Sequence, residues 1–211
     1  AGEEAGRGLD ILLLVDTSRS MAAEDIAPSR LALAKRAVTT ILDRLEGNRF
    51  ALVQYAATAF PLCPFTRDVG VIKLLVDNLD TTSMPVAGTD LGHAVTAALA
   101  VMTRTVETAS PHRAILIIGD GENFGGRPIP AVKRAAEDGL RTYTLGVGTL
   151  AGAPVPPPAA GAAASAGDKK TVLREKNLSL LALFGGGTYF RLTPALEELD
   201  EMNYRSILAG L

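Results

Sequence analysis

The sequence is poor in the residues that build several common kinds of site. It contains one cysteine, two histidines and no tryptophan, and aromatic residues make up only 5% of the chain. Because Cys63 is alone, no disulfide can form within these 211 residues and no cysteine-based zinc cluster is available. The shortage of aromatic side chains favours helices packed closely on a sheet over an aromatic-rich β architecture.

Two further absences narrow the classes of function. The formal net charge is only −2 with both signs mixed along the chain, so we expect no basic surface for nucleic acid. No apolar run approaches the roughly 18 residues that span a bilayer. The polar residues 1–4 do not look like the start of a signal peptide. We therefore expect either a soluble protein or a soluble segment of a membrane-anchored one.

Strand-like and helix-like stretches alternate along the chain. The apolar run 11–15 is short and continuous, which is typical of a strand buried on both faces of a parallel sheet. Residues 50–55 and 59–63 are too close for a crossover, so they predict an antiparallel hairpin at a sheet edge. Further strands are expected at 112–118, 141–147, 171–173 and 188–192, and helices at 28–45, 68–79, 89–105, 130–138, 178–184 and from 194 onward.

This order predicts an α/β fold with a doubly wound, mainly parallel sheet, one antiparallel edge strand, and helices on both faces. With 47% hydrophobic residues, the chain is expected to form a single domain over residues 1–211. Residues 1–8 are expected to be an N-terminal tail. Residues 150–170, rich in alanine, proline and glycine, are expected to be an exposed insertion. In the first helix the apolar positions repeat from Leu31 to Leu45, and Arg30 is placed away from them.

Oxygen-bearing side chains gather in three loops of this pattern. Asp16, Ser18 and Ser20 follow the first strand at alternate positions, Thr89 precedes a helix, and Asp120 follows the 112–118 strand. In a doubly wound sheet ligands bind at the carboxyl ends of strands where the winding reverses, which is where two of these loops are expected to meet. An oxygen-only set suits a hard cation such as Mg2+, with Ca2+ or Mn2+ as alternatives. Taken alone, however, the Asp16 loop is equally consistent with an ordinary turn or helix cap.

The chain resembles the von Willebrand factor A domains at this point. The family pattern of their metal-ion-dependent adhesion site is Asp-x-Ser-x-Ser, then a threonine, then an aspartate, and all five positions match in order. The resemblance covers residues 9 to about 208, and within the family it is strongest to the bacterial aerotolerance (Bat-type) membrane proteins. Four stretches carry that likeness, namely residues 16–21 (DTSRSM), 24–31 (EDIAPSRL), 88–92 (GTDLG) and 143–148 (YTLGVG). Gly119 departs from the pattern, because relatives usually have threonine there.

The resemblance implies a metal-dependent protein-binding module. In such sites the three hydroxyls bind the cation directly, one or both carboxylates act through water, and a carboxylate of a partner protein completes the coordination. Here Ser18, Ser20 and Thr89 are the implied hydroxyl ligands, and Asp16 and Asp120 the implied carboxylates. The resemblance also implies a bacterial cytoplasmic membrane protein, tethered by flanking helices outside this segment, with the domain on the periplasmic side. Asp90 is expected to cap its helix instead of binding metal.

Two other classes of function, an enzyme and a purely structural domain, are also consistent with parts of this pattern. A Mg2+ at a switch point also serves phosphoryl transfer, so a Mg2+-dependent phosphoryl-transfer enzyme is the alternative. Against it, Ser18 stands where the haloacid-dehalogenase phosphatases need a second aspartate, and neither a glycine-rich phosphate loop nor a Walker lysine follows the first strand. No Ser/His/Asp set is evident either. A purely structural domain with an empty site is the third interpretation, which five retained oxygen ligands argue against.

Overall fold

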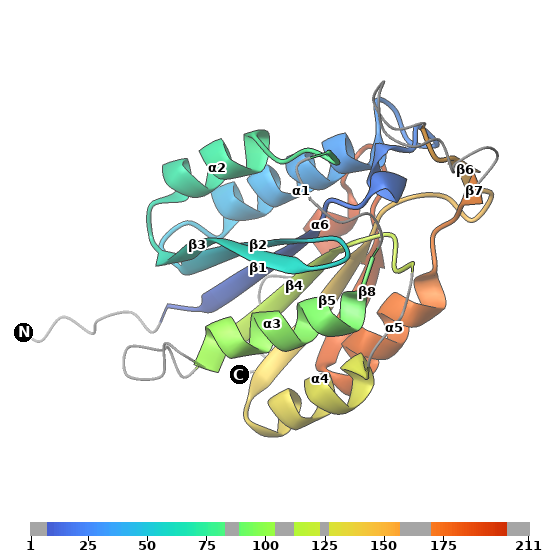
Figure 1. The fold of residues 1–211 in the computed structure, drawn as a ribbon. Coiled ribbons are helices and arrows are strands. Elements are labelled where there is room, and N and C mark those ends of the chain that lie inside the picture. Colours follow the sequence, from blue (N-terminus) through green and yellow to red (C-terminus); the bar gives the residue numbers. More distant parts are fainter. Residues whose placement is uncertain (1–7, 83–88, 104–111, 123–126, 157–169, 202–211) are drawn as a thin grey trace, which may run out of the picture.

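A computed structural model describes residues 8–82, 89–103, 112–122, 127–156 and 170–201 (Figure 1). Its centre is a mixed six-stranded sheet in the order β3-β2-β1-β4-β5-β8. Five strands run parallel and only β3 is antiparallel to its neighbour β2. The strands are β1 (Asp10–Asp16), β2 (Arg49–Tyr55), β3 (Ala59–Thr66), β4 (Arg113–Gly119), β5 (Leu140–Gly146) and β8 (Gly186–Arg191). The predicted fold class and the edge hairpin are confirmed.

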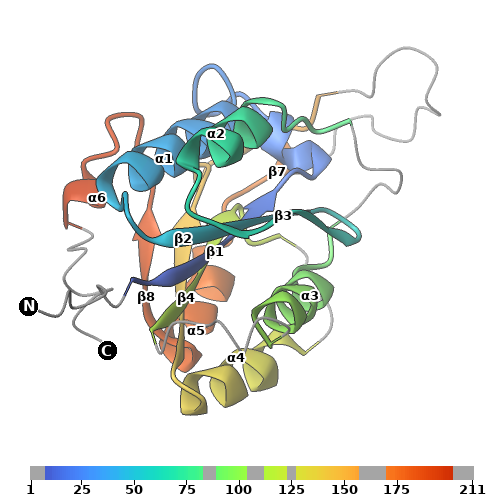
Figure 2. The ribbon, with the colours of Figure 1, turned by 90° about the vertical axis from the view of Figure 1, so that its left-hand side faces the viewer.

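Helices cover both faces of this sheet, as Figure 2 shows. On one face lie α1 (Arg30–Arg44), α2 (Val69–Asp77) and α6 (Glu198–Glu201), and on the other α3 (Leu91–Thr103), α4 (Pro128–Glu137) and α5 (Glu175–Phe184). Side chains of β1 alternate between the two cores, so that Ile11 and Leu13 face one and Leu12 and Leu14 the other. All seven residues of β1 are buried, as a central strand covered on both faces requires.

The winding of the chain reverses at β1. From β1 the chain passes to β2 on one side, and it later returns to β4 on the other side of β1. Because β1 and β4 are parallel neighbours, the loops after Asp16 and Gly119 leave the same edge of the sheet. This neighbourhood, on which the predicted site depends, is confirmed.

Several predicted element boundaries are wrong for local reasons. The first helix begins at Arg30 and not at Pro28, because the Ser29 side chain accepts a hydrogen bond from the Ala32 N–H and caps it. Strand β3 continues past Pro64, because it is an edge strand with irregular pairing there. The last described helix begins at Glu198 and not at Pro194, since Leu196 has a left-handed backbone (φ 58°).

Two short elements frame the carboxyl edge of the sheet. A 3-10 helix, η1 (Arg19–Ala22), follows the Asp16 loop where irregular chain was expected. The strands β6 (Ala153–Pro154) and β7 (Lys170–Thr171) pair with each other and form a ribbon separate from the main sheet. They lie at the two ends of the expected insertion, whose residues 157–169 are outside the described part of the chain. In Figure 1 the ribbon lies at the same end of the molecule as η1.

Candidate metal centre

The loop after β1 arranges three oxygen-bearing side chains in a buried turn. The Asp16 carboxylate accepts a hydrogen bond from the Ser18 N–H through Oδ1 (2.8 Å), and the hydroxyls of Ser18 and Ser20 lie 2.9 Å apart. The loop is fixed from the side by the Thr17 N–H, which donates to the Tyr55 carbonyl at 2.8 Å. Asp16 is fully buried, and Ser18 and Ser20 are 3% and 7% exposed. The alternate spacing therefore brings all three side chains into one buried turn.

Asp120 joins this group from the end of β4. Its side chain is fully buried, and Oδ1 accepts the Glu122 N–H at 3.0 Å. Burial raises the pKa of Asp120, and hydrogen bonds from the Ser20 hydroxyl and the Glu122 backbone oppose that rise. The Ser20 contact shows that the first and third predicted loops meet at the sheet edge.

The two carboxylates repel each other in this buried setting. Burial, followed by the charge of Asp120, raises the pKa of Asp16 to about 8, although hydrogen bonds from Ser18 and the nearby Tyr55 hydroxyl oppose the rise. Two buried carboxylates at close range favour a proton or a cation between them. The electrostatic potential of the site therefore favours the binding of a cation.

Thr89 is brought to the same edge by α3. The Asp90 N–H, one residue later, donates to the Ala56 carbonyl at 2.8 Å, and Ala56 directly follows β2. Since Tyr55 is paired with Asp16 across β2 and β1, this bond places the start of α3 beside the Asp16 loop. Thr89 is half-buried there. Asp90 accepts the His93 N–H at 2.9 Å, so the expected capping role is confirmed.

One oxygen of Asp16 accepts no hydrogen bond of ordinary geometry from the described residues, although the Tyr55 hydroxyl lies near the Asp16 carboxyl group. Among the described residues, Asp16 Oδ2 and the Tyr55 hydroxyl are both buried side-chain atoms without a hydrogen bond. A buried carboxylate oxygen without a partner is costly, and its presence at an intended site indicates a missing ion or water. Together with the hydroxyls of Ser18 and Ser20, it forms a hard, oxygen-only set that fits a small divalent cation.

The departure at Gly119 has a steric reason in this chain. A Cβ at position 119 would lie 2.7 Å from Asp16 Cβ and 2.8 Å from the Tyr55 hydroxyl oxygen. The Tyr55 ring is fully buried and its hydroxyl takes up the space that a larger side chain at 119 would need. Gly119 and Tyr55 are thus complementary, and together they pack against the Asp16 side chain.

Arg30 is the residue of this region that the sequence reasoning misplaced. The sequence pattern predicts that Arg30 lies away from the apolar positions of the first helix. In the structure, however, its side chain is fully buried and forms ion pairs with Asp120 at 3.0 Å and Asp25 at 2.8 Å. The signal was present, because Arg30 precedes Ala34 by four residues and so lies on the buried helix face. Gly148 makes room for it, since a Cβ there would lie 2.8 Å from Arg30 Nε.

Charged residues alone would not reveal this site. Within the described residues, no group of three or more histidine, cysteine, aspartate or glutamate side chains is placed to hold a metal ion. The candidate site has only two carboxylates, and hydroxyls make up the rest. The site is therefore not recognisable from a cluster of these four residue types.

A family model for the von Willebrand factor type A domain matches residues 11–122, just over half of the chain. The chain belongs to this family. The match begins in β1 and ends two residues beyond Asp120, so it contains all five positions of the predicted site.

The solved structures and curated proteins that resemble this von Willebrand A domain agree with the predicted likeness to aerotolerance proteins. An aerotolerance-related membrane protein from Bacteroides fragilis is 29% identical, with a TM-score of 0.84 over 96% of this chain and 100% of that one. A UPF0353 protein from Mycolicibacterium paratuberculosis is 29% identical over 150 residues, 67% of this chain and 46% of its own length. The chain thus spans about half the length of the curated relatives it matches.

A more distant neighbour shows the same fold. Proximal thread matrix protein 1 from the mussel byssus, solved with a zinc-occupied adhesion-site motif, is 15% identical, with a TM-score of 0.65 over 95% of this chain and 47% of that one. At this identity the likeness concerns the fold alone.

None of the helices in the described part of this chain has the length and apolar character that a membrane span requires.

Proposed function

We propose that this domain is a metal-dependent protein-binding module and not an enzyme. A divalent cation, Mg2+ by expectation and Ca2+ or Mn2+ as alternatives, would be held by the hydroxyls of Ser18, Ser20 and Thr89, with Asp16 and Asp120 assisting through water. When bound, it would supply an incompletely neutralised positive charge to which an acidic side chain of a partner protein can bind. The observation that carries the proposal is the buried, unpartnered Asp16 Oδ2 beside two hydroxyls and a second carboxylate.

The chain's own residues support this role. The three hydroxyl ligands bring no negative charge, so compensation of a bound cation comes from carboxylates that are not its direct ligands, chiefly Asp16 and Asp120, and Arg30 already pairs with Asp120. Since the direct ligands are neutral, the cation would keep its attraction for an anionic group at an open coordination position, where a partner's carboxylate can bind. The zinc-occupied motif of the mussel protein and the shared family support a divalent cation here. Tethering in a bacterial cytoplasmic membrane, with the domain on the periplasmic side, is proposed from the description of the Bacteroides relative as a membrane protein.

The proposal is tested by cation-dependent capture of partners. Immobilised domain is incubated with a solubilised bacterial membrane fraction in Mg2+ or in EDTA, and retained proteins are eluted with EDTA. Asp16→Ala should lose both Mg2+ uptake, measured by calorimetry, and EDTA-eluted binding, while its circular dichroism stays that of the wild type. Asp10→Ala, at the opposite end of β1, is the matched control and should keep both. Unchanged Mg2+ affinity in Asp16→Ala would refute the assignment.

Phosphoryl transfer gives a different outcome in the same samples. If the domain hydrolyses a generic phosphate ester, and this activity requires Mg2+ and is lost in Asp16→Ala, then the domain is a phosphoryl-transfer enzyme and the proposed binding function is wrong.

A further inference from the structure

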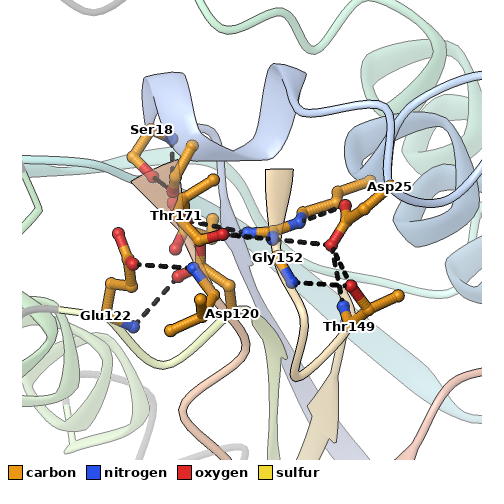
Figure 3. A network of polar contacts seen from close by, with 11 residues as sticks. Ser18, Asp25, Asp120, Glu122, Thr149, Gly152 and Thr171 are labelled. Atoms are coloured by element: carbon orange, nitrogen blue, oxygen red, sulfur yellow. Dashed lines mark hydrogen bonds and ion pairs between the residues drawn. The ribbon is translucent and has the colours of Figure 1, made fainter. Parts of the chain in front are cut away.

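Arg30 lies at the centre of a buried polar network beside the candidate metal centre. Its guanidinium is 0% exposed and points from the first turn of α1 toward the sheet edge. Nε and Nη2 donate to the two carboxylate oxygens of Asp25, each at 2.8 Å. Nη1 donates to Asp120 Oδ2 at 3.0 Å and to the Thr171 hydroxyl at 2.9 Å. Figure 3 shows Asp25, Asp120 and Thr171 converging in this network.

The network is held from the far side by the loop of residues 149–152, which leads into β6. Asp25 Oδ2 accepts from both the N–H (2.8 Å) and the hydroxyl (2.9 Å) of Thr149, and the Thr149 hydroxyl accepts the Gly152 N–H at 2.9 Å (Figure 3). Burial alone would raise the pKa of Asp25, but the hydrogen bonds from Arg30 and Thr149 outweigh it and hold that pKa at about 2. Asp25 is therefore ionised at neutral pH, and Arg30 is fixed between two acids.

This arrangement occupies both oxygens of Asp120. Oδ1 accepts the Glu122 N–H, and Oδ2 accepts from Arg30 with a longer contact of 3.4 Å from the Thr171 hydroxyl. Asp16 differs, because its Oδ2 has no partner among the described residues. The two acids of the candidate site are thus unequal. Within the described part of the chain Asp16 keeps one oxygen without a well-formed hydrogen bond, whereas both oxygens of Asp120 are held and Arg30 partly neutralises its charge.

We propose that Arg30 is a positioning residue of the metal site that acts through Asp120 and weakens cation binding. This inference rests on the proposed function. By holding Asp120 Oδ2, Arg30 keeps that carboxylate from turning toward the cation as a direct ligand. Its positive charge also opposes that of the cation at short range. A weakly held, poorly neutralised cation is the one that binds an acidic partner most strongly.

The test measures Mg2+ affinity by calorimetry in charge variants of the network. Arg30→Met removes the opposing charge and frees Asp120, so Mg2+ should bind on the order of tenfold more tightly. A role in folding alone would leave the affinity unchanged or weaken it. Arg30→Lys keeps the charge and should stay within about threefold of the wild type. Arg49→Met is the matched control, because it breaks the Arg49–Asp10 pair at the other end of β1, roughly 20 Å away, and should leave the affinity unchanged.

A second variant keeps the inference testable if Arg30→Met does not fold. Asp25→Asn removes the negative charge that offsets Arg30, so Mg2+ affinity should fall by about threefold, opposite in sign to Arg30→Met. Unchanged affinity in Asp25→Asn, or unchanged or weaker affinity in folded Arg30→Met, overturns the inference while wild-type Mg2+ binding leaves the proposed function standing. A wild-type domain that takes up no divalent cation overturns both.

Discussion

The two ends of strand β1 treat buried charge in opposite ways. At its beginning, Asp10 is paired with Arg49, whose Nε donates to one carboxylate oxygen and Nη2 to the other, at 2.7 and 2.5 Å. At its end, Asp16 lies beside Asp120, and the guanidinium of Arg30 is shared between Asp120 and Asp25. The first end is electrically balanced and its polar atoms are paired. The second has more carboxyl groups than arginines, and Asp16 Oδ2 accepts no well-formed hydrogen bond from the described residues.

The difference separates a structural ion pair from a binding site. A balanced pair of fixed geometry has nothing left to offer a ligand. Two crowded, buried carboxyl groups cost folding free energy unless a proton or a cation neutralises them, so this end of β1 is suited to a cation that displaces a proton after folding. This is the physical argument for a metal site at the Asp16 end, and it does not depend on the family resemblance.

Replacing the arginine at each end of β1 should produce the largest change in the free energy of unfolding. Arg30→Met leaves two acids without their buried cation and should lower the free energy of unfolding by about 3–5 kcal/mol. Arg49 has a side chain 22% exposed to water, which can solvate what remains after Arg49→Met, so the loss there should be smaller, about 1–2 kcal/mol. Urea denaturation in EDTA measures both. Equal losses would mean that the two ends do not differ in kind.

Packing at the acid-rich end sharpens the comparison. Gly119→Ala would place a Cβ against Asp16 and the Tyr55 hydroxyl, and we expect a loss of roughly 1–3 kcal/mol in unfolding free energy. Tyr55→Phe removes the hydroxyl oxygen and should restore part of that loss in the double variant. Gly70→Ala, at an exposed position of α2 where the nearest atom to an added Cβ is the Asp68 carboxylate at 3.2 Å, is the control, and it should change the stability less than Gly119→Ala does. Additive losses in the double variant would contradict the proposed fit between Gly119 and Tyr55.

Acid should remove one contribution from the Asp16 end. The pKa of Asp25 is about 2 in the folded protein against 3.8 as the ordinary value, so the folded state binds its proton less readily than the unfolded one. The stabilisation is therefore present above about pH 4 and is lost as the pH falls through about 2, with a size of at most about 2 kcal/mol. The stability difference between wild type and Asp25→Asn should shrink over this range. A difference independent of pH would show that the Asp25 charge contributes nothing.

Sequence patterns were sufficient for the parts of this molecule that depend on periodicity. The continuous apolar run of β1, the short link between β2 and β3, and the acids that end β1 and β4 predicted the sheet, its edge hairpin and the meeting of two loops. The buried network was not predictable in the same way. Arg30 is a charged residue on a buried helix face. One of its acceptors, Asp25, lies five residues earlier, but Asp120 and Thr171 are 90 and 141 residues away in sequence. Only the fold reveals that these groups compensate one another.

The position of the Tyr55 hydroxyl beside the candidate site could not be predicted from the sequence for a related reason. Its strand position predicts a core residue, which it is, but not that its tip reaches Asp16 and fills the space above Gly119. Thr89 is the reverse case, because its side chain was predicted from the family pattern, and the structure adds the bond from Asp90 to Ala56 that brings it to the sheet edge.

The central claim is that a divalent cation binds at the Asp16 end of β1 and nowhere near the Asp10 end. Anomalous diffraction from a crystal soaked in Mn2+ tests it most directly. The account predicts a single strong peak among the hydroxyl oxygens of Ser18, Ser20 and Thr89, at roughly 2.0–2.3 Å from each. The absence of a peak at saturating Mn2+, or a peak whose protein ligands do not include these hydroxyls, would contradict it.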